Sequence, residues 1–189
     1  MPAQQHLLRD CRHDIMRAGL TDQQDMNSLR GIFRECSAQL GRLHPLAYVY
    51  VVWILSYGIV LPLIYLDSLA PHAALHMEGG PTNMPAFALP GRLVLGCIIV
   101  PPIETMLFQW LPLRLLHTWL KLPGWLAVLA SGALFGAAHG YSSGYMNFTF
   151  LIGLVLAWAF LVRDHEGGKA YLWVGVVHAM RNALAALLM

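Results

Sequence analysis

Five long apolar stretches dominate the pattern of hydrophobic and polar positions along the chain. Each meets, or nearly meets, the requirement of about 20 residues for a helix that spans a bilayer. They cover residues 47–66, 93–116, 122–139, 148–162 and 170–189. Because the fourth run is short, we expect its helix to take in residues 145–147 as well. The pattern predicts an all-α fold, a polytopic bundle of about five transmembrane helices.

The first 45 residues follow a different pattern, in which apolar residues recur on one face of each of two predicted helices. These faces consist of Leu7, Leu8, Cys11, Ile15 and Ala18, and of Met26, Leu29, Phe33, Cys36 and Leu40. Thr21, followed three residues later by Gln24, has the spacing of a capping box before the second helix. We expect residues 1–45 to form amphipathic helices in the cytosol or at the interface, and residues 46–189 to form the transmembrane domain.

The composition agrees with a membrane protein. Of 189 residues, 57% are hydrophobic and 12% are charged, and the mean hydropathy is +0.54. This charged fraction is about half that of an ordinary soluble domain. A net charge of +2 without a basic tract gives no reason to expect a nucleic-acid partner. The three cysteines are widely spaced and predict free thiols rather than a disulfide framework.

Basic residues in the connecting segments predict an orientation, because segments rich in Lys and Arg stay on the cytoplasmic side. Six arginines lie in residues 1–45, and the turns at residues 114–121 and 163–169 carry two basic residues each. On the opposite side, Arg92 stands alone. The amino terminus is therefore predicted to be cytoplasmic and the carboxyl terminus extracytoplasmic.

Glu104 is an ionisable residue inside the second apolar run. An acid at membrane depth costs about 2.5–3.5 kcal/mol on insertion scales, so it is a candidate functional group by default. Glu104 follows Leu93 by eleven residues, which places it about 16 Å into the span. Thr105 and Gln109 share a neighbouring face of the same helix. The carboxyl could act as a general base, or it could only hydrogen-bond another helix.

Two histidines and an amide lie in other apolar runs. His139 ends the sequence F-G-A-A-H, whose small residues allow close helix approach. His178 and Asn182 are four residues apart and share one face of an otherwise apolar helix. Such a pair can donate hydrogen bonds to an oxyanion, although polar pairs also join helices without chemistry. An acid, two histidines and an amide on three helices form a hydrolytic set.

Three motifs in chain order carry a family resemblance. They are E-T-M-L-F-Q at residues 104–109, F-G-A-A-H at 135–139 and H-A-M-R-N at 178–182. These stretches resemble the E-E-x-x-x-R, F-x-x-x-H and H-x-x-x-N patterns of the CAAX-protease and bacteriocin-processing (CPBP, or Abi) family of glutamic intramembrane proteases. The resemblance covers residues 93–189, about half of the chain.

The resemblance implies an intramembrane endopeptidase of a bacterial inner membrane that cleaves a membrane-tethered protein or peptide. It implies that Glu104 and His139 activate a water, and that His178 and Asn182 steady the tetrahedral oxyanion. The expected supporting residues are Thr105, Phe108, Gln109, Phe135 and Arg181. We expect no metal cofactor, with Zn²⁺ held by Glu104 and the two histidines as the alternative.

The first motif departs from the family pattern at two positions. Thr105 stands where the family usually has a second Glu, and Gln109 where it usually has Arg. One ion-pair partner of each sign is lost together, which fits a coherent variant or a non-proteolytic member. Arg181, three residues after His178, is our candidate for the missing cation beside Glu104.

Other functions remain open at this stage. The same polar residues could join helices in an immunity or scaffold protein, or couple protons in a small transporter, although neither an inverted repeat nor paired broken helices are seen. Residues 140–144 match G-x-S-x-G, but that nucleophile elbow requires a strand–turn–helix context.

His139 also poses a problem of depth, because it closes the third run while Glu104 and His178 lie near mid-membrane. Either this helix continues through Gly140 to about Tyr145, or the charge-based orientation misleads about where the site opens.

Overall fold

The computed structural model describes residues 31–69 and 88–188, and the regular elements in these ranges are all helical. The chain divides into two units, Met1–Arg42 and Leu43–Met189. In the first unit, residues 31–42 are helical. The rest of the predicted amphipathic segment, including the capping box at Thr21 and Gln24, lies outside the described residues.

The second unit contains the helices that are expected to cross the membrane. It begins with α2 (Pro45–Gly58) and α3 (Leu61–Leu69). A continuous helical stretch, Leu89–Trp119, then alternates α-helical and π-helical turns: α4 (Leu89–Leu93), η2 (Val94–Ile99), α5 (Val100–Glu104), η3 (Thr105–Trp110), α6 (Leu111–Leu113) and η4 (Arg114–Trp119). The last three helices are α7 (Gly124–Ala138), α8 (Ser143–Arg163) and α9 (Ala170–Leu188).

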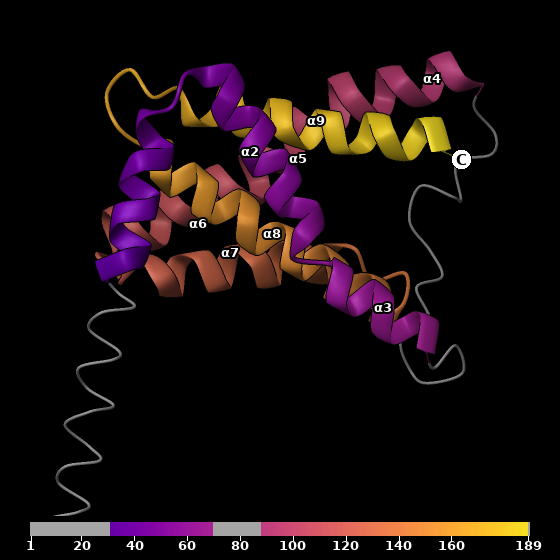
Figure 1. Ribbon diagram of the computed structural model, residues 1–189, viewed down its shortest axis with the longest axis horizontal. Helices are drawn as coiled ribbons and strands as arrows, with labels where there is room; N and C mark the ends of the chain where they lie inside the picture. Colours follow the sequence, from indigo (N-terminus) through magenta and orange to yellow (C-terminus); the bar gives the residue numbers. More distant parts are fainter. Residues whose placement is uncertain (1–30, 70–87, 189) are drawn as a thin grey trace, which may run out of the picture. The chain divides into compact units, whose positions relative to one another are not determined.

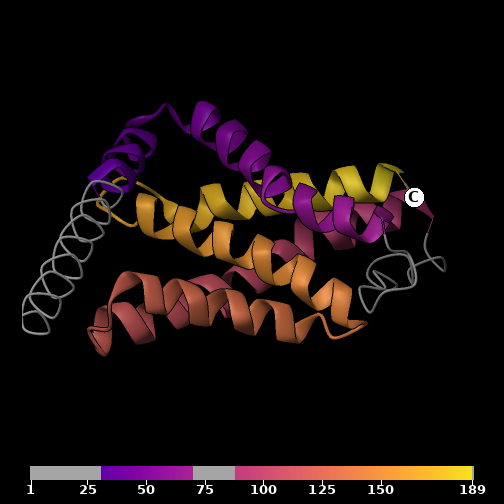
Figure 2. The same cartoon turned by 60° about the horizontal axis from the view of Figure 1, so that its bottom comes forward.

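Helix α8 is the centre of this unit. It packs against α7 on one side and against α2 and α9 on the other, as Figures 1 and 2 show. Its inner face is fully buried at Leu156, Ala157 and Ala159. Tyr48 of α2, also fully buried, donates its hydroxyl to the Ala159 carbonyl at 2.7 Å. The core therefore lies where α8 meets its three neighbours.

The helices confirm the all-α prediction and refine the predicted spans. Within the described residues, three helical stretches are long and apolar enough to cross a membrane: Pro45–Leu69, Leu89–Trp119 and Ser143–Arg163. The fourth run begins at Ser143, earlier than its apolar core, as expected. The other two predicted spans are α7, which has only 15 residues, and α9, whose polar residues lower its hydropathy.

Prolines explain the irregular turns of the Leu89–Trp119 stretch. Pro101 and Pro112 each lack the N–H that would pair with a carbonyl of the preceding turn. In η2 the Val100 N–H reaches back five residues to the Leu95 carbonyl. In that register the next carbonyl, at Gly96, has residue 101 as its donor, and a proline there leaves it unpaired. Neighbouring helices must supply the missing donors, because lipid cannot.

Glycines let α7 and α8 approach closely. A Cβ built on Gly136 would lie 2.9 Å from the Met146 carbonyl oxygen and 2.9 Å from the Phe150 Cβ. A Cβ on Gly153 of α8 would lie 3.0 Å from the Gly132 Cα. Small residues in such an interface allow backbones to touch in a membrane. The G-x-x-x-G spacing of Gly132 and Gly136 therefore sets how near α8 comes to the end of α7.

We predict that Gly136→Ala destabilises the protein by about 1–3 kcal/mol, the usual cost of overpacking, since the clash includes backbone atoms that cannot turn aside. Gly58→Ala is the matched control, because a Cβ at Gly58 meets nothing within 4 Å. Unfolding midpoints of the two variants and the wild type in the same detergent measure the difference. An unchanged midpoint for Gly136→Ala would contradict the close α7–α8 contact.

Candidate active site

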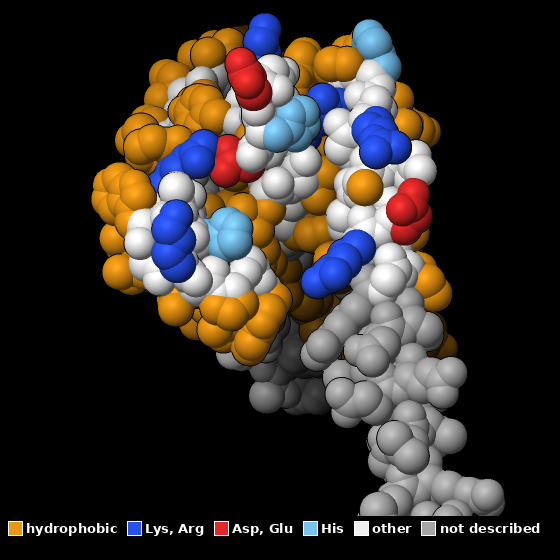
Figure 3. All heavy atoms as spheres, turned by 90° about the vertical axis from the view of Figure 1, so that its left-hand side faces the viewer, with side chains coloured by type: hydrophobic (Ala, Val, Ile, Leu, Met, Phe, Trp, Pro, Cys, Tyr) orange, Lys and Arg blue, Asp and Glu red, His pale blue; other side chains and the backbone are white. Residues whose placement is uncertain are grey.

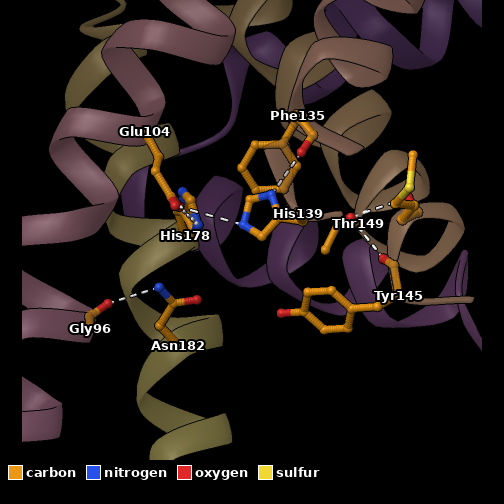
Figure 4. A network of polar contacts seen from close by, with 9 residues as sticks. Gly96, Glu104, Phe135, His139, Tyr145, Thr149, His178 and Asn182 are labelled. Carbon is orange, nitrogen blue, oxygen red and sulfur yellow. Dashed lines mark hydrogen bonds and ion pairs between the residues drawn. The ribbon is translucent and has the colours of Figure 1, made fainter. Parts of the chain in front are cut away.

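Three ionisable side chains from three helices meet in the second unit. Glu104, the last residue of α5, has one carboxylate oxygen 3.2 Å from Nε2 of His178 and the other 3.7 Å from Nε2 of His139. Figure 4 shows the three side chains converging, with His178 coming from α9 and His139 from the end of α7. The exposed fractions of their side chains are 21%, 5% and 16%, in the order Glu104, His178, His139. The sequence-predicted acid and both histidines thus lie together.

His139 is placed by the end of α7. The helix stops at Ala138, and His139 is its C-cap with φ −105° and ψ 41°. Of the two explanations considered for its depth, continuation of the helix through Gly140 to about Tyr145 is wrong, because the chain turns at Gly140 and Ser142 caps the start of α8 by accepting a hydrogen bond from the Tyr145 N–H at 3.1 Å. With only 15 residues, α7 ends at the depth of Glu104, and this resolves the mismatch in depth.

The ring of His139 is fixed by its own helix. Its Nδ1 lies 2.7 Å from the Phe135 carbonyl oxygen. A carbonyl only accepts, so Nδ1 carries the proton and Nε2 is the nitrogen that faces Glu104. The ring of Phe135 packs against His139 with centroids 4.5 Å apart, and against His178 with centroids 5.5 Å apart. Phe135, a predicted supporting residue, therefore spaces the two imidazoles.

His178 is the most buried member of the site. The whole residue is 4% exposed, and its Nε2 faces Glu104. Within the described part of the chain, Nδ1 of His178 has no hydrogen-bond partner. A buried polar atom without a partner is costly, so this nitrogen is available for a water or a bound substrate.

Asn182 lies one turn beyond His178 on α9. Its Nδ2 donates to the Gly96 carbonyl at 2.8 Å, as drawn in Figure 4. This is the carbonyl that Pro101 leaves without a donor in η2. The hydrogen bond orients the carboxamide and uses one of its two amide hydrogens. The structure thus places Asn182 beside the site, held by backbone and not by Glu104.

Thr105 and Gln109, the two departures from the family pattern, are fully buried on the face of η3 that packs against other helices. A Cβ built on Gly175 of α9 would lie 4.0 Å from Oγ1 of Thr105. Within the described residues, Oγ1 of Thr105 and both side-chain polar atoms of Gln109 lack hydrogen-bond partners. The positions expected to carry an ion pair therefore hold a neutral pair in a closed environment.

Phe108 contributes to the site through its ring and its backbone. Its ring meets that of Phe135 edge-on, with centroids 5.7 Å apart. Its carbonyl accepts a hydrogen bond from the buried hydroxyl of Ser131 on α7. Phe108 thus ties η3 to the helix that carries His139.

Our expectation that Arg181 supplies a cation beside Glu104 is wrong. Arg181 is 7% exposed, its Nη1 donates to Oγ of Ser56 at 2.6 Å, and its guanidinium carbon lies 4.2 Å from the ring centroid of Tyr57. Among the described residues, the ion-pairing groups found near Glu104 are the two histidines. Arg181 sits three positions after His178, so it turns toward α2 instead.

Sequence reasoning missed Ser56, Ser131 and Tyr145. Tyr145 lies beside the site, with its ring centroid 6.0 Å from that of His139. Its signal was the G-Y-S-S-G-Y turn after His139, which carries aromatic residues close to the candidate base. Ser143 of the same turn starts a helix, and no strand precedes it in the described part of the chain, so the nucleophile-elbow context is not met.

The same three side chains were our alternative zinc ligands. In the described ranges, no group of three or more His, Cys, Asp or Glu side chains is arranged to hold a metal ion.

The family model described as type II CAAX prenyl endopeptidase Rce1-like matches residues 86–184, a range that includes all three motifs. The chain belongs to this Rce1-like family, which confirms the resemblance seen in its sequence. Comparison with curated proteins and with solved structures gives no match.

We predict that Ser56→Ala lowers the free energy of unfolding by about 1–3 kcal/mol, since it leaves a buried guanidinium N–H of Arg181 without an acceptor. Ser68→Ala is the control, because the exposed Ser68 hydroxyl bonds only to its own helix at Tyr65. Denaturation in detergent reports both values. Equal stability of the two variants would indicate that Arg181 has its main partner elsewhere.

Proposed function

We propose that the protein hydrolyses a peptide bond with a water activated by Glu104. Membership of the family supports endopeptidase activity on a membrane-associated protein. The observation that carries the mechanism is the position of the Glu104 carboxylate between two imidazole nitrogens, at 3.2 and 3.7 Å. No serine or cysteine nucleophile is required in this scheme.

The gap between Glu104 and His139 supports a place for the water. A separation of 3.7 Å is too long for a direct hydrogen bond, and it allows one water beside the pair to bond to both groups. In the proposed step, Glu104 takes a proton from this water as it attacks the scissile carbonyl carbon. The carbon–oxygen bond forms and the carbonyl electrons move to oxygen. His139, held by the Phe135 carbonyl, orients the water; the proton then passes to the leaving amine as the amide bond breaks.

His178 and Asn182 are the proposed oxyanion donors. Their i,i+4 spacing puts both on one face of α9. His178 retains an unpartnered ring nitrogen, which donates when protonated, and Asn182 retains the second hydrogen of its amide. Donors already fixed where charge develops stabilise a transition state without reorganising, and each can account for about a hundredfold or more in rate.

The proposal also covers the orientation of the protein in the membrane and the kind of substrate. Arg114 and Asp164, 2.5 Å apart, join η4 to the end of α8. The two basic segments predicted from the sequence, residues 114–121 and 163–169, therefore meet at one end of the unit. By the positive-inside rule this end faces the cytoplasm of a bacterial inner membrane. The substrate is a membrane-tethered protein or peptide, either prenylated or of the bacteriocin or sorting-signal kind.

We predict that Glu104→Gln lowers cleavage by at least about a hundredfold, the usual contribution of a general base, while the protein stays folded. Gln has the shape of Glu but cannot take the proton. Glu166→Gln is the matched control, because Glu166 is an exposed acid in the α8–α9 loop. Mass spectrometry of membrane peptides from the native host, compared among wild type and both variants, measures product and precursor.

Products that vanish only in Glu104→Gln, at an unchanged unfolding midpoint, support the protease. Products found equally in wild type and Glu104→Gln would favour the non-catalytic scaffold instead.

We also predict that chelators such as 1,10-phenanthroline leave cleavage of the precursor unchanged, since a carboxylate rather than a Lewis acid activates the water. The measurement uses purified wild type before and after chelation, with excess Zn²⁺ returned afterwards. Activity lost on chelation and restored by Zn²⁺ would establish the zinc alternative.

A further inference from the structure

A cavity of about 350 Å³ lies where η3 and the start of η4 meet the α8–α9 turn. Its lining includes Trp110, Arg114, Arg163, Asp164, Lys169 and Tyr171. Figure 3 looks onto this region, where charged and histidine side chains gather among hydrophobic flanks. Trp110 and Arg114 follow Glu104 by six and ten residues, or about 9–15 Å of helix. The cavity is thus separate from the Glu104 site.

The charge of this cavity is positive. Arg114, Arg163 and Lys169 contribute three cations, and Asp164 contributes one carboxylate, which leaves two positive charges in excess. Asp164 is paired with Arg114 at 2.5 Å. The unneutralised charges are therefore those of Arg163 and Lys169.

Arg163 is a buried cation with an unmet donor. It is 6% exposed, its Nη2 donates to the Leu43 carbonyl at 2.6 Å, and its guanidinium carbon lies 4.6 Å from the Tyr48 ring centroid. Within the described residues, its Nε–H has no hydrogen-bond partner. Arginine presents its donors as a planar fork that matches phosphate oxygens. A buried, incompletely bonded guanidinium at a cavity calls for an anion.

The start of α9 adds further donors. Trp173 N–H is bonded to the Lys169 carbonyl, so the N–H groups of Ala170, Tyr171 and Leu172 precede the first i→i−4 bond of the helix. All three residues line the cavity. The amino terminus of a helix favours an anion through these N–H groups and its dipole.

We propose that this cavity binds the phosphate of an anionic phospholipid headgroup. Trp110 and Leu172, which line the cavity, are 38% and 49% exposed and offer apolar surface to the acyl chains of a bound lipid. A free phosphate would not use that surface. A zwitterionic headgroup would bring an ammonium toward an already positive cavity, so the charge selects anionic lipid.

The test is native mass spectrometry of the full-length protein in detergent, titrated with phosphatidylglycerol, with phosphatidylcholine of the same chains, and with soluble glycerol 3-phosphate. We expect phosphatidylglycerol to bind in preference to the other two. Lys169→Asn should weaken its binding about fivefold, the value of one basic residue near a membrane surface. Asn tolerates the positive φ of 52° at this position, and Lys169→Gly, which fits it without strain, should give the same loss.

Lys121→Asn is the matched control. Lys121 is also exposed, also has a positive φ, of 56°, and lies outside the cavity lining. The Lys121→Asn variant should bind phosphatidylglycerol as the wild type does. Unchanged binding in both Lys169 variants, an equal loss in Lys121→Asn, or phosphatidylcholine binding as well as phosphatidylglycerol would each overturn the proposal. Displacement of the lipid by glycerol 3-phosphate at similar concentration would assign the cavity to a free phosphate instead.

Discussion

The site depends on backbone carbonyls of the Leu89–Trp119 helix that accept hydrogen bonds from side chains of neighbouring helices. In a membrane each such carbonyl must be paired within the protein. The Gly96 carbonyl takes its hydrogen bond from Asn182, and the Phe108 carbonyl takes one from Ser131. These donors belong to α9 and α7, the helices that carry His178 and His139. These two hydrogen bonds, one before and one after Glu104, thus join its helix to the two helices that carry the histidines, and Pro101 explains the first of them.

Buried charges, like buried carbonyls, need partners within the protein. A charge removed from water needs compensating contacts, such as hydrogen bonds, an opposite charge or an aromatic face. At α2, Arg181 has a hydrogen bond to Ser56 and a cation–π contact with Tyr57 rather than a counter-ion, and it is not available to Glu104. With a neutral Thr105 and Gln109 beside the acid, Glu104 has only imidazoles as partners among the described groups. Its carboxylate is therefore not ion-paired with a guanidinium and can accept a proton.

Much of this arrangement could be predicted from the sequence, because it follows from local patterns. Apolar runs gave the helices, and three motifs in chain order selected Glu104, His139 and His178, which the fold brings together. The direction of Arg181 was not predictable, since it depends on a serine 125 residues away. The sequence also could not show that the Gly96 carbonyl lacks a backbone donor. This follows from a π-helical register that the presence of proline alone does not specify.

The early end of α7 favours the access of water that the proposed mechanism requires. A helix of 15 residues spans about 22 Å, less than the hydrocarbon core of about 30 Å, so an α7 that starts at one surface ends inside the membrane. The turn that follows His139 then exposes irregular backbone at that depth. Such backbone is tolerated only when it is buried in protein or lines a water-filled cavity. Where this turn lines a water-filled cavity, the same water is available for the proposed hydrolysis at Glu104.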